Sequence, residues 1–231
     1  AKKLKFIARA GSGTENIDLH YANKNNIKCF NAAEGNRQAV AEHALAMILN
    51  LLNNIRISDQ EIRTGIWDRE KNRGFELSGK TIGIIGFGNT GSSFAKILEN
   101  FNVKILAYDK YKEKYKFQSN LDEILEFSDI ISLHIPLTEE TRYLVNENFI
   151  VKAKKPFYII NTSRGQCIET KALIKGLKDQ KILGACLDVF EQEKSSFEKI
   201  GENADLKYLI ESNKTILTPH IAGWTFESNY K

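Results

Sequence analysis

Cysteine and histidine are both scarce in this chain of 231 residues, which contains three cysteines and four histidines. The cysteines, Cys29, Cys167 and Cys186, are odd in number and lack the spacing of metal ligands, so the sequence argues against a disulfide framework and against a metal site. Cys29 and Cys186 lie in apolar runs and are predicted to be buried thiols. We therefore expect a reducing, cytoplasmic environment.

Long apolar runs and a strong charge of one sign are also missing. No stretch is long enough to span a membrane, and the start AKKLKFIARAG does not continue into the apolar segment of an export signal. Thirty-three basic and 29 acidic residues give a net charge of +4, which suits a small anionic substrate. Nucleic-acid binding is disfavoured, because we find no dense basic stripe and no set of stacking aromatic residues.

From Thr81 onward, apolar strands and helices alternate regularly. Strands are expected at 81–86, 103–109, 129–134, 156–161, 182–189 and 215–219, and helices at 90–101, 120–128, 139–153 and 169–180. This alternation predicts an α/β fold with a parallel sheet and right-handed crossovers. Six strands match a doubly wound, Rossmann-like dinucleotide-binding domain.

The first 80 residues are less regular. Short strands are expected at 4–8 and 27–30, each followed by a polar or glycine-rich turn. Residues 38–57 predict one long helix, apolar over much of its surface and hence buried between domains or against a second subunit. The expected domains are a partial second domain with this helix at 1–57, a linker at 58–78, the dinucleotide-binding domain at 79–223 and a return segment at 224–231.

The segment GIIGFGNTG places Gly86, Gly88 and Gly91 in the spacing G-x-G-x-x-G, after an expected strand and at the start of an expected helix. Such glycines permit a tight turn and close approach of a pyrophosphate, which the helix N-terminus faces with unpaired N–H groups. Asp109 ends the next expected strand, where a carboxylate binds the ribose hydroxyls of an adenosine. The sequence therefore predicts a dinucleotide cofactor.

Polar residues follow the other expected strands at the same edge of the sheet, which is where parallel sheets bind ligands. The expected cofactor-binding residues are Gly86, Gly88, Asn89, Thr90, Gly91, Asp109, His134, Pro136, Thr162, Asp188 and Gly223. The carboxylate of Asp109 favours NAD because it repels a 2′-phosphate. Lys110 and Lys112 beside it leave NADP as the alternative.

Arg164, Glu193 and His220 are expected at this edge too, and their chemistry suits the oxidation of a 2-hydroxy acid. Hydride removal from a carbinol carbon requires a base for the hydroxyl proton, and histidine titrates near pH 6.5. A carboxylate orients that histidine and favours its protonated form, while an arginine can hold the substrate carboxylate in a bidentate manner. His43, without an obvious acidic partner, is interpreted as structural.

At these residues the sequence resembles the D-isomer-specific 2-hydroxyacid dehydrogenases, over essentially the whole chain. NTSRG, LDVFEQE and TPHIAG resemble the family motifs that carry the substrate-binding arginine, the glutamate and the acid/base histidine, which are Arg164, Glu193 and His220 here. The resemblance implies an NAD-dependent enzyme with part of a smaller, flavodoxin-like substrate domain. Relative to the family, initial βα units and a final helix are missing, so we expect the protein to extend beyond this sequence.

The resemblance also implies roles for the first domain. The turn at Gly11 and Ser12 cradles the substrate carboxylate, and helix 38–57 forms a homodimer. ARAGSGTENID and NAAEGN look most like phosphoglycerate dehydrogenases, which implies oxidation of 3-phosphoglycerate to 3-phosphohydroxypyruvate in serine biosynthesis. A second anion site is then required, and its candidates are Arg9 and the cluster of Arg69, Lys71 and Arg73.

Two alternatives to that function stay open at this point. One is a reductase of glyoxylate, hydroxypyruvate or another 2-oxo acid. The other is a protein that binds NAD as a sensor without catalysis, because a fold does not specify an activity.

Overall fold

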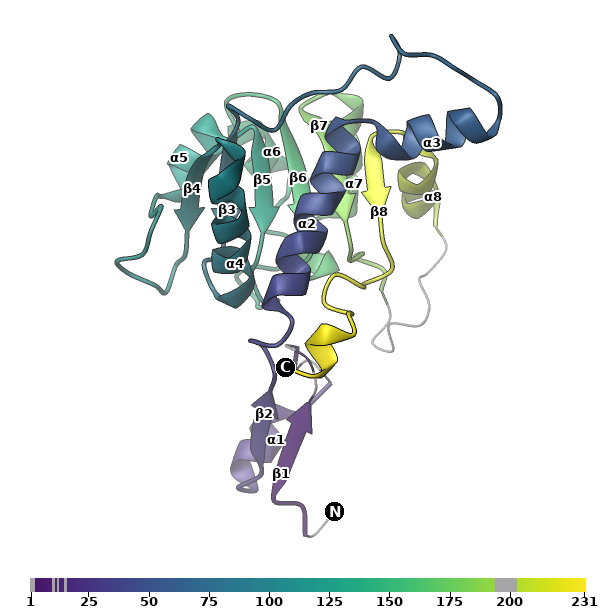
Figure 1. Ribbon diagram of the computed structural model, residues 1–231. Helices are drawn as coiled ribbons and strands as arrows, with labels where there is room; N and C mark the ends of the chain where they lie inside the picture. Colours follow the sequence, from purple (N-terminus) through teal and green to yellow (C-terminus); the bar gives the residue numbers. More distant parts are fainter. Residues whose placement is uncertain (1–2, 10, 12, 15, 194–202) are drawn as a thin grey trace.

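The computed structural model describes residues 3–9, 11, 13–14, 16–193 and 203–231, which form a two-stranded and a six-stranded parallel sheet (Figure 1). The strands are β1 (Phe6–Arg9), β2 (Lys28–Asn31), β3 (Thr81–Ile85), β4 (Lys104–Tyr108), β5 (Ile130–Leu133), β6 (Phe157–Asn161), β7 (Ile182–Leu187) and β8 (Thr215–Leu217). The helices are α1 (Leu19–Lys24), α2 (Arg37–Leu52), α3 (Ile55–Arg63), α4 (Asn89–Leu98), α5 (Leu121–Phe127), α6 (Glu147–Lys152), α7 (Thr170–Lys178) and α8 (Ala204–Glu211). Three short 3-10 turns span Glu99–Phe101, Gly165–Cys167 and Glu227–Asn229.

The large sheet has the strand order β4-β3-β5-β6-β7-β8. A one-residue bridge from Ala107 to Gln118 continues it beyond β4, where Ala107 accepts from Ser119 N at 2.8 Å and donates to Phe117 O at 2.7 Å. With that bridge counted, the strands follow the doubly wound order of dinucleotide-binding domains, with one additional strand at the β8 edge. The expected α/β fold is therefore confirmed, and the bridge is a short strand that the sequence did not predict.

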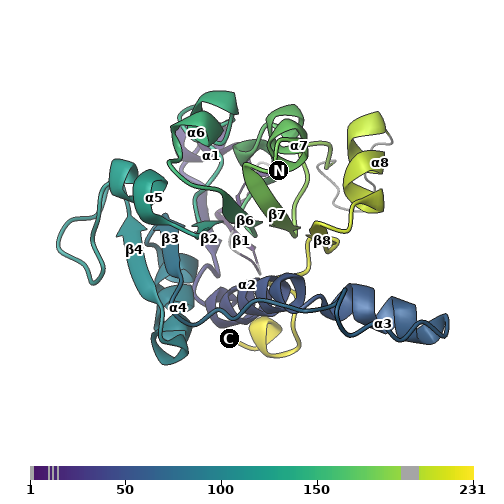
Figure 2. The same cartoon turned by 90° about the horizontal axis from the view of Figure 1, so that it is seen from above.

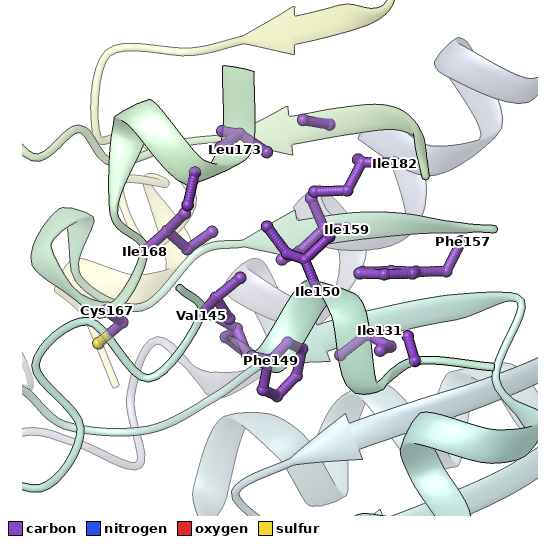
Figure 3. Close-up of a cluster of buried hydrophobic side chains, with 14 of the residues drawn as sticks. Ile131, Val145, Phe149, Ile150, Phe157, Ile159, Cys167, Ile168, Leu173 and Ile182 are labelled. Carbon is purple, nitrogen blue, oxygen red and sulfur yellow. The ribbon is translucent and has the colours of Figure 1, made fainter. Parts of the chain in front are cut away.

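Helices cover both faces of this sheet, with α2 and α4 on one face and α5, α6 and α7 on the other (Figure 2). Consecutive strand residues face opposite cores: Ile130 and Ile160 pack with α2 and α4, while Ile131 and Ile159 pack on the opposite side (Figure 3). All four are fully buried. A sheet covered on both faces explains why its strands read as continuous apolar runs rather than as alternating patterns.

The prediction of one helix over 38–57 is wrong. α2 ends at Leu52, Asn54 adopts a left-handed conformation with φ of 53°, and α3 begins at Ile55 and extends into the expected linker. Asparagine tolerates that conformation better than most residues, which makes it a natural point for a change of direction. The apolar surface of α2 lies against α4 and strands β6 to β8 of its own chain.

Two asparagines begin helices that the sequence predicted poorly. The side chain of Asn146 accepts from Phe149 N at 3.1 Å and starts α6. Only the last part of the expected helix 139–153 is therefore helical. Asn203 accepts from Leu206 N at 2.7 Å and starts α8, which was not predicted. Helix α1 was also missed.

The small sheet of β1 and β2, with α1, lies beyond the N-terminal end of α2 (Figure 1). Its strands point their carboxyl ends toward those of the large sheet, whereas α3 and the connector that follows it lie at the opposite end of the molecule. Cys167 and Cys186 are buried as core residues, but Cys29 is only partly buried. In the described part of the chain, no helix has the length and apolar character needed to cross a membrane.

Candidate active site

The three glycines of the first loop differ in what requires them. Gly86 has φ of 94°, and a Cβ there would lie 2.3 Å from the carbonyl oxygen of His134. A Cβ on Gly91 would lie 2.0 Å from the carbonyl oxygen of Gly86. A Cβ on Gly88 would meet nothing within 4 Å, so the chain's own packing does not require this glycine. An open position here fits a loop that lets a pyrophosphate approach the backbone closely.

Helix α4 begins at this loop without a side-chain cap. Gly88 is its N-cap residue and makes no side-chain hydrogen bond to the first turn, where Asn89 and Thr90 follow. The first N–H groups of a helix lack partners within the helix, and its dipole favours a negative charge there. The N-terminus of α4 can therefore hold the phosphates of a dinucleotide.

Asp109 lies beside the glycine-rich loop at the end of β4. One carboxylate oxygen accepts from Phe87 N at 2.8 Å, and the other accepts from Tyr111 N at 3.0 Å. Lys112 donates to the carbonyl oxygen of Phe87 at 2.9 Å, and Lys110 pairs with an acidic side chain at 2.8 Å. Both lysines are thus held by the protein itself, which leaves the carboxylate as the group that suits an unphosphorylated ribose.

Two buried polar atoms at the ends of β5 and β6 find no hydrogen-bond partner among the described residues: His134 Nδ1 and Thr162 Oγ1. Such atoms are rare in folded proteins unless a ligand or water meets them, so they fit a bound cofactor. The Nε2 atom of His134 lies 2.9 Å from Ser132 Oγ. Burial lowers the pKa of His134 to about 3, so its ring is neutral near pH 7 and is not the acid/base. Pro136 follows on the same loop and is exposed.

A buried asparagine holds the loop that carries Arg164. Asn161, which is 1% exposed, donates to the Arg164 carbonyl oxygen at 2.9 Å and accepts from the Ser163 hydroxyl at 2.8 Å. A Cβ on Gly165 would lie 2.0 Å from the backbone of Phe190, so this loop packs directly on the segment after β7. The Arg164 guanidinium is partly buried and donates to the Ser163 carbonyl oxygen at 2.6 Å.

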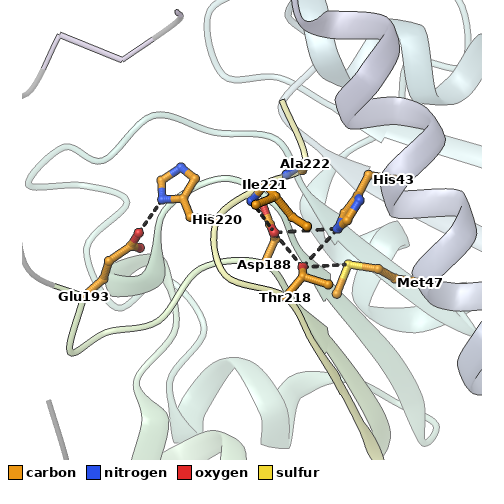
Figure 4. Close-up of polar contacts among 8 residues, drawn as sticks. All are labelled: His43, Met47, Asp188, Glu193, Thr218, His220, Ile221 and Ala222. Carbon is orange, nitrogen blue, oxygen red and sulfur yellow. Dashed lines mark hydrogen bonds and ion pairs between the residues drawn. The ribbon is translucent and has the colours of Figure 1, made fainter. Parts of the chain in front are cut away.

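The acid/base pair expected from the sequence is assembled. His220 Nδ1 is in hydrogen-bond contact with Glu193 Oε1, and Nε2 points away from the carboxylate (Figure 4). The side chains are 26% and 16% exposed, so both remain accessible to a small molecule. His220 has φ of 57°, a left-handed conformation that is uncommon for a residue other than glycine and often marks a functional position.

Asp188 holds the loop that carries His220. Its carboxylate, 1% exposed, accepts from Ile221 N at 2.9 Å, from Ala222 N at 2.8 Å and from the Thr218 hydroxyl at 2.5 Å. Its carbonyl oxygen accepts from His220 N at 2.8 Å. The expected contact of Asp188 with the cofactor stays a prediction, whereas its hydrogen bonds to Thr218, Ile221 and Ala222 show that it holds this loop. Thr218 was not singled out, although a polar residue directly after a buried strand was the available signal.

Helix α2 touches the same loop at two points. The Nε2 atom of His43 lies 3.0 Å from Thr218 Oγ1 and 3.6 Å from Asp188 Oδ1, so the interpretation that His43 lacks an acidic partner is wrong (Figure 4). A Cβ on Gly223 would lie 2.6 Å from the side-chain nitrogen of Asn36, the residue before α2. A larger residue at position 223 would therefore displace the Asn36 side chain.

The expected substrate loop follows β1. Arg9 donates through its guanidinium to the Gly13 carbonyl oxygen, and Gly11, with φ of 146°, accepts from Ala32 N at 2.9 Å. Ser12 lies outside the described residues. Figure 1 places the end of β1 toward the carboxyl edge of the large sheet, as a substrate-binding role requires.

The basic cluster proposed for a substrate phosphate is not at this site. Lys71 pairs with Glu61 and Arg73 pairs with Glu70 at 2.6 Å. Together with Arg69 they belong to the connector after α3, at the end of the molecule opposite the small sheet (Figure 1). All three basic residues are exposed or largely exposed, as a solvated linker would be. Within the described ranges, no three His, Cys, Asp or Glu side chains are grouped as metal ligands would be.

Comparison with known proteins decides the family. The profile of the D-isomer specific 2-hydroxyacid dehydrogenase NAD-binding domain matches residues 45–222. This chain belongs to that family. It is 40% identical over 243 residues to a glyoxylate reductase of Thermofilum pendens, covering 100% of the chain and 69% of the relative. It is 36% identical to a D-3-phosphoglycerate dehydrogenase of Archaeoglobus fulgidus, covering 99% of the chain and 43% of the relative.

A solved D-2-hydroxyacid dehydrogenase has the same fold. The D-lactate dehydrogenase of Aquifex aeolicus, in complex with NAD and lactic acid, superimposes with a TM-score of 0.86 at 35% identity, covering 98% of this chain and 71% of that one. The predicted fold, the enzyme class of NAD-dependent 2-hydroxyacid dehydrogenases and the cofactor NAD are thereby confirmed. The individual roles of the residues above stay predictions.

Proposed function

We propose that this protein transfers a hydride between NAD(H) and C2 of a small 2-hydroxy or 2-oxo carboxylate, with Arg164, Glu193 and His220 as its catalytic residues. The observation that carries the proposal is the His220–Glu193 contact, which lies at the same sheet edge as the glycine-rich loop. An acid/base group and a dinucleotide-binding loop at one edge are what such a reaction requires. The match of residues 45–222 to the NAD-binding domain of the D-isomer specific 2-hydroxyacid dehydrogenases supports the same assignment.

The proton transfer follows from the orientation of His220. Bound NAD supplies the hydride acceptor. His220 Nε2 takes the proton of the C2 hydroxyl during oxidation, and it returns that proton to the C2 oxygen during reduction. Glu193 holds Nδ1–H, which fixes the ring and stabilises the imidazolium formed on oxidation.

Arg164 binds the substrate. A guanidinium can hold the substrate carboxylate with two parallel hydrogen bonds, and it polarises the neighbouring C2 oxygen. The Arg164 loop is fixed by buried Asn161, so little reorganisation is needed on binding. Backbone N–H groups of the turn at Gly11 complete the carboxylate site in this proposal.

An unphosphorylated acid, glyoxylate or hydroxypyruvate, is our first candidate for the substrate. Arg164 serves one carboxylate in this proposal, and the cluster around Lys71, a candidate for binding a second anion, lies at the other end of the molecule. The similarity to a glyoxylate reductase, at 40% identity, supports this choice. The proposed direction is then reduction of the 2-oxo acid by NADH.

A second candidate is 3-phosphoglycerate, which would place the protein in serine biosynthesis. Arg9 at the end of β1 is the remaining described candidate for its phosphate, and the similarity to a D-3-phosphoglycerate dehydrogenase supports it. A phosphomonoester carries nearly two negative charges at neutral pH. Arg9→Gln should then raise KM for 3-phosphoglycerate with less effect on kcat, because a contact made equally in ground and transition states appears in KM.

One panel of substrates tests these proposals. Glyoxylate, hydroxypyruvate and pyruvate are each offered with NADH, and D-glycerate, D-lactate and 3-phosphoglycerate with NAD, while absorbance of the reduced cofactor is followed. We expect the highest kcat/KM with glyoxylate or hydroxypyruvate. A clear preference for 3-phosphoglycerate would support the second candidate. NADH binding without turnover of any acid would contradict the enzymatic proposal and favour an NAD sensor.

We also propose a homodimer in the cytoplasm. The apolar surface of α2 is covered by its own chain, but large apolar side chains are exposed on α3 and the connector: Ile55 at 53%, Ile62 at 52%, Trp67 at 80% and Phe75 at 62%. Several large apolar side chains exposed on neighbouring segments of the chain fit a protein contact. The three cysteines are free thiols, which fits a reducing compartment.

A further inference from the structure

His43 is the one histidine on α2, and its ring points at the base of the loop that carries His220 (Figure 4). Its Nε2 atom lies 3.0 Å from Thr218 Oγ1, although the two residues are 175 positions apart in the chain. The side chain is 21% exposed. A partly buried histidine that contacts a catalytic loop from another element needs a physical explanation beyond filling space.

The hydrogen bonds around Thr218 have a defined direction. The hydroxyl carries a single hydrogen, and Asp188 Oδ1 at 2.5 Å is a far stronger acceptor than Met47 Sδ at 3.9 Å. Thr218 therefore donates to Asp188 and has only lone pairs left for His43. The Nε2 atom of His43 must then carry a hydrogen, so the donor chain runs from His43 through Thr218 to Asp188.

Asp188, the last residue in this series of hydrogen bonds, holds the backbone beside His220. Asp188 accepts from Ile221 N and Ala222 N through its carboxylate and from His220 N through its carbonyl oxygen. His220 has a left-handed φ of 57°, a conformation that persists only where surrounding contacts impose it. A shift of the Asp188 carboxylate would therefore turn the imidazole relative to the substrate.

We propose that His43 is a positioning residue for the acid/base His220, acting through Thr218 and Asp188. The proposal rests on the assignment of His220 made above. Helix α2 leads from the small sheet, where the substrate loop begins, into the core of the large domain (Figure 1). The His43 contact thus ties the catalytic loop to the helix that connects the two parts of the site.

The test compares His43→Leu, which removes the donor, with His43→Gln, whose side-chain amide can place a donor near the position of Nε2. On whichever acid the unmodified enzyme turns over best, we expect His43→Leu to lower kcat by about tenfold to a hundredfold, the effect of a small misplacement of a reacting group. KM and the Kd for NADH should stay within about twofold. His43→Gln should recover most of the lost kcat.

A double-mutant cycle shows whether the effect passes through Thr218. Thr218→Val should lower kcat in the same way as His43→Leu, and the double variant should be no slower than the slower single variant. His20→Leu, at an exposed histidine of α1, is the matched control and should leave kcat unchanged. If His43→Leu fails to fold, Thr218→Ser, which keeps the hydroxyl, is compared with Thr218→Val.

A second readout does not depend on turnover. The imidazole NMR signals of His220, assigned with His220→Ala, should move in His43→Leu and remain in place in His20→Leu. Unchanged His220 signals, kcat effects that multiply in the double variant, or a Gln variant as slow as the Leu variant would each overturn the proposal. A lowered Tm with unchanged kcat in both His43 variants would show a purely structural role.

Discussion

The His220 ring and the Glu193 carboxylate meet through Nδ1 and Oε1 although they lie 27 positions apart in the chain. Neighbouring strands bring them together, because Glu193 follows β7, His220 follows β8, and these two strands pair in parallel. The contact engages Nδ1, so Nε2 is the nitrogen that we propose as the acid/base atom. It also joins two separate sequence motifs into the pair that we propose to be catalytic.

Replacing His220 and replacing Glu193 should change turnover in two different ways. We expect His220→Ala to lower kcat by about a hundredfold to ten-thousandfold, the usual contribution of a positioned proton-transfer group. Glu193→Gln should keep measurable kcat but move the pH profile to lower pH, because the imidazolium loses its countercharge. Steady-state kinetics from pH 5 to 9 (roughly the range in which histidine titrates) measure both effects. Full activity of His220→Ala would refute the assignment.

Substitutions at two glycines of the cofactor loop should have different effects, one on stability and the other on cofactor affinity. Gly91→Ala should lower the free energy of unfolding by about 1–3 kcal/mol, because its Cβ meets the Gly86 carbonyl oxygen. Gly88→Ala should leave Tm unchanged yet raise the Kd for NADH about tenfold to a hundredfold through lost charge-assisted hydrogen bonds to phosphate. Urea unfolding and NADH fluorescence titration provide the two measurements. Equal effects on Tm in both variants would contradict this division.

Asp109 should set the preference for NAD over NADP. Removing the carboxylate in Asp109→Ser should lower kcat/KM with NAD and raise the NADP-to-NAD ratio of kcat/KM by about tenfold or more, because a 2′-phosphate is no longer repelled. Kinetics with the two cofactors at equal substrate concentration test it. Asp122→Ser, at an exposed aspartate of α5, is the control. An unchanged ratio in Asp109→Ser would place cofactor selection elsewhere.

His134 should make stability depend on pH. Burial lowers its pKa to about 3, whereas an unfolded histidine titrates near 6.5, so between these values the unfolded chain binds the extra proton. The free energy of unfolding is therefore largest above pH 6.5 and falls with pH below it, by about 1.4 kcal/mol per pH unit from this residue. His134→Asn should show a shallower fall in urea unfolding between pH 6.5 and 4. Parallel curves for the two proteins would contradict the burial argument.

The exposed apolar residues after α2 should form the dimer contact. Trp67→Glu should weaken self-association at least about thirtyfold, the effect of losing an interface residue that contributes 2 kcal/mol or more. Trp224→Glu is the matched control, because Trp224 is 74% exposed but lies after β8 rather than on the connector. Sedimentation at several protein concentrations measures both. A monomeric unmodified protein, or dissociation of both variants alike, would refute this interface.

Much of the large domain was predictable because its signals are local. Each strand of the large sheet is a short apolar run, and each of its glycine, arginine and histidine motifs directly follows such a run. In a parallel sheet the carboxyl ends share one edge, so the positions of Arg164, Glu193 and His220 in the sequence were enough to place all three at that edge. The small helices α1 and α8 carry weaker patterns and were missed.

By itself, the sequence determined the parallel sheet, the glycine-rich loop and the sheet edge that carries the proposed catalytic residues, since the period of a strand, the spacing of glycines and the order of residues are local signals. Only the tertiary structure decided which distant side chains meet them. His43 reaches Thr218 and Asp188 because α2 crosses the large sheet, and Lys71 is far from the substrate loop because its connector runs to the opposite end. No local pattern encodes such contacts, because they depend on where whole elements pack.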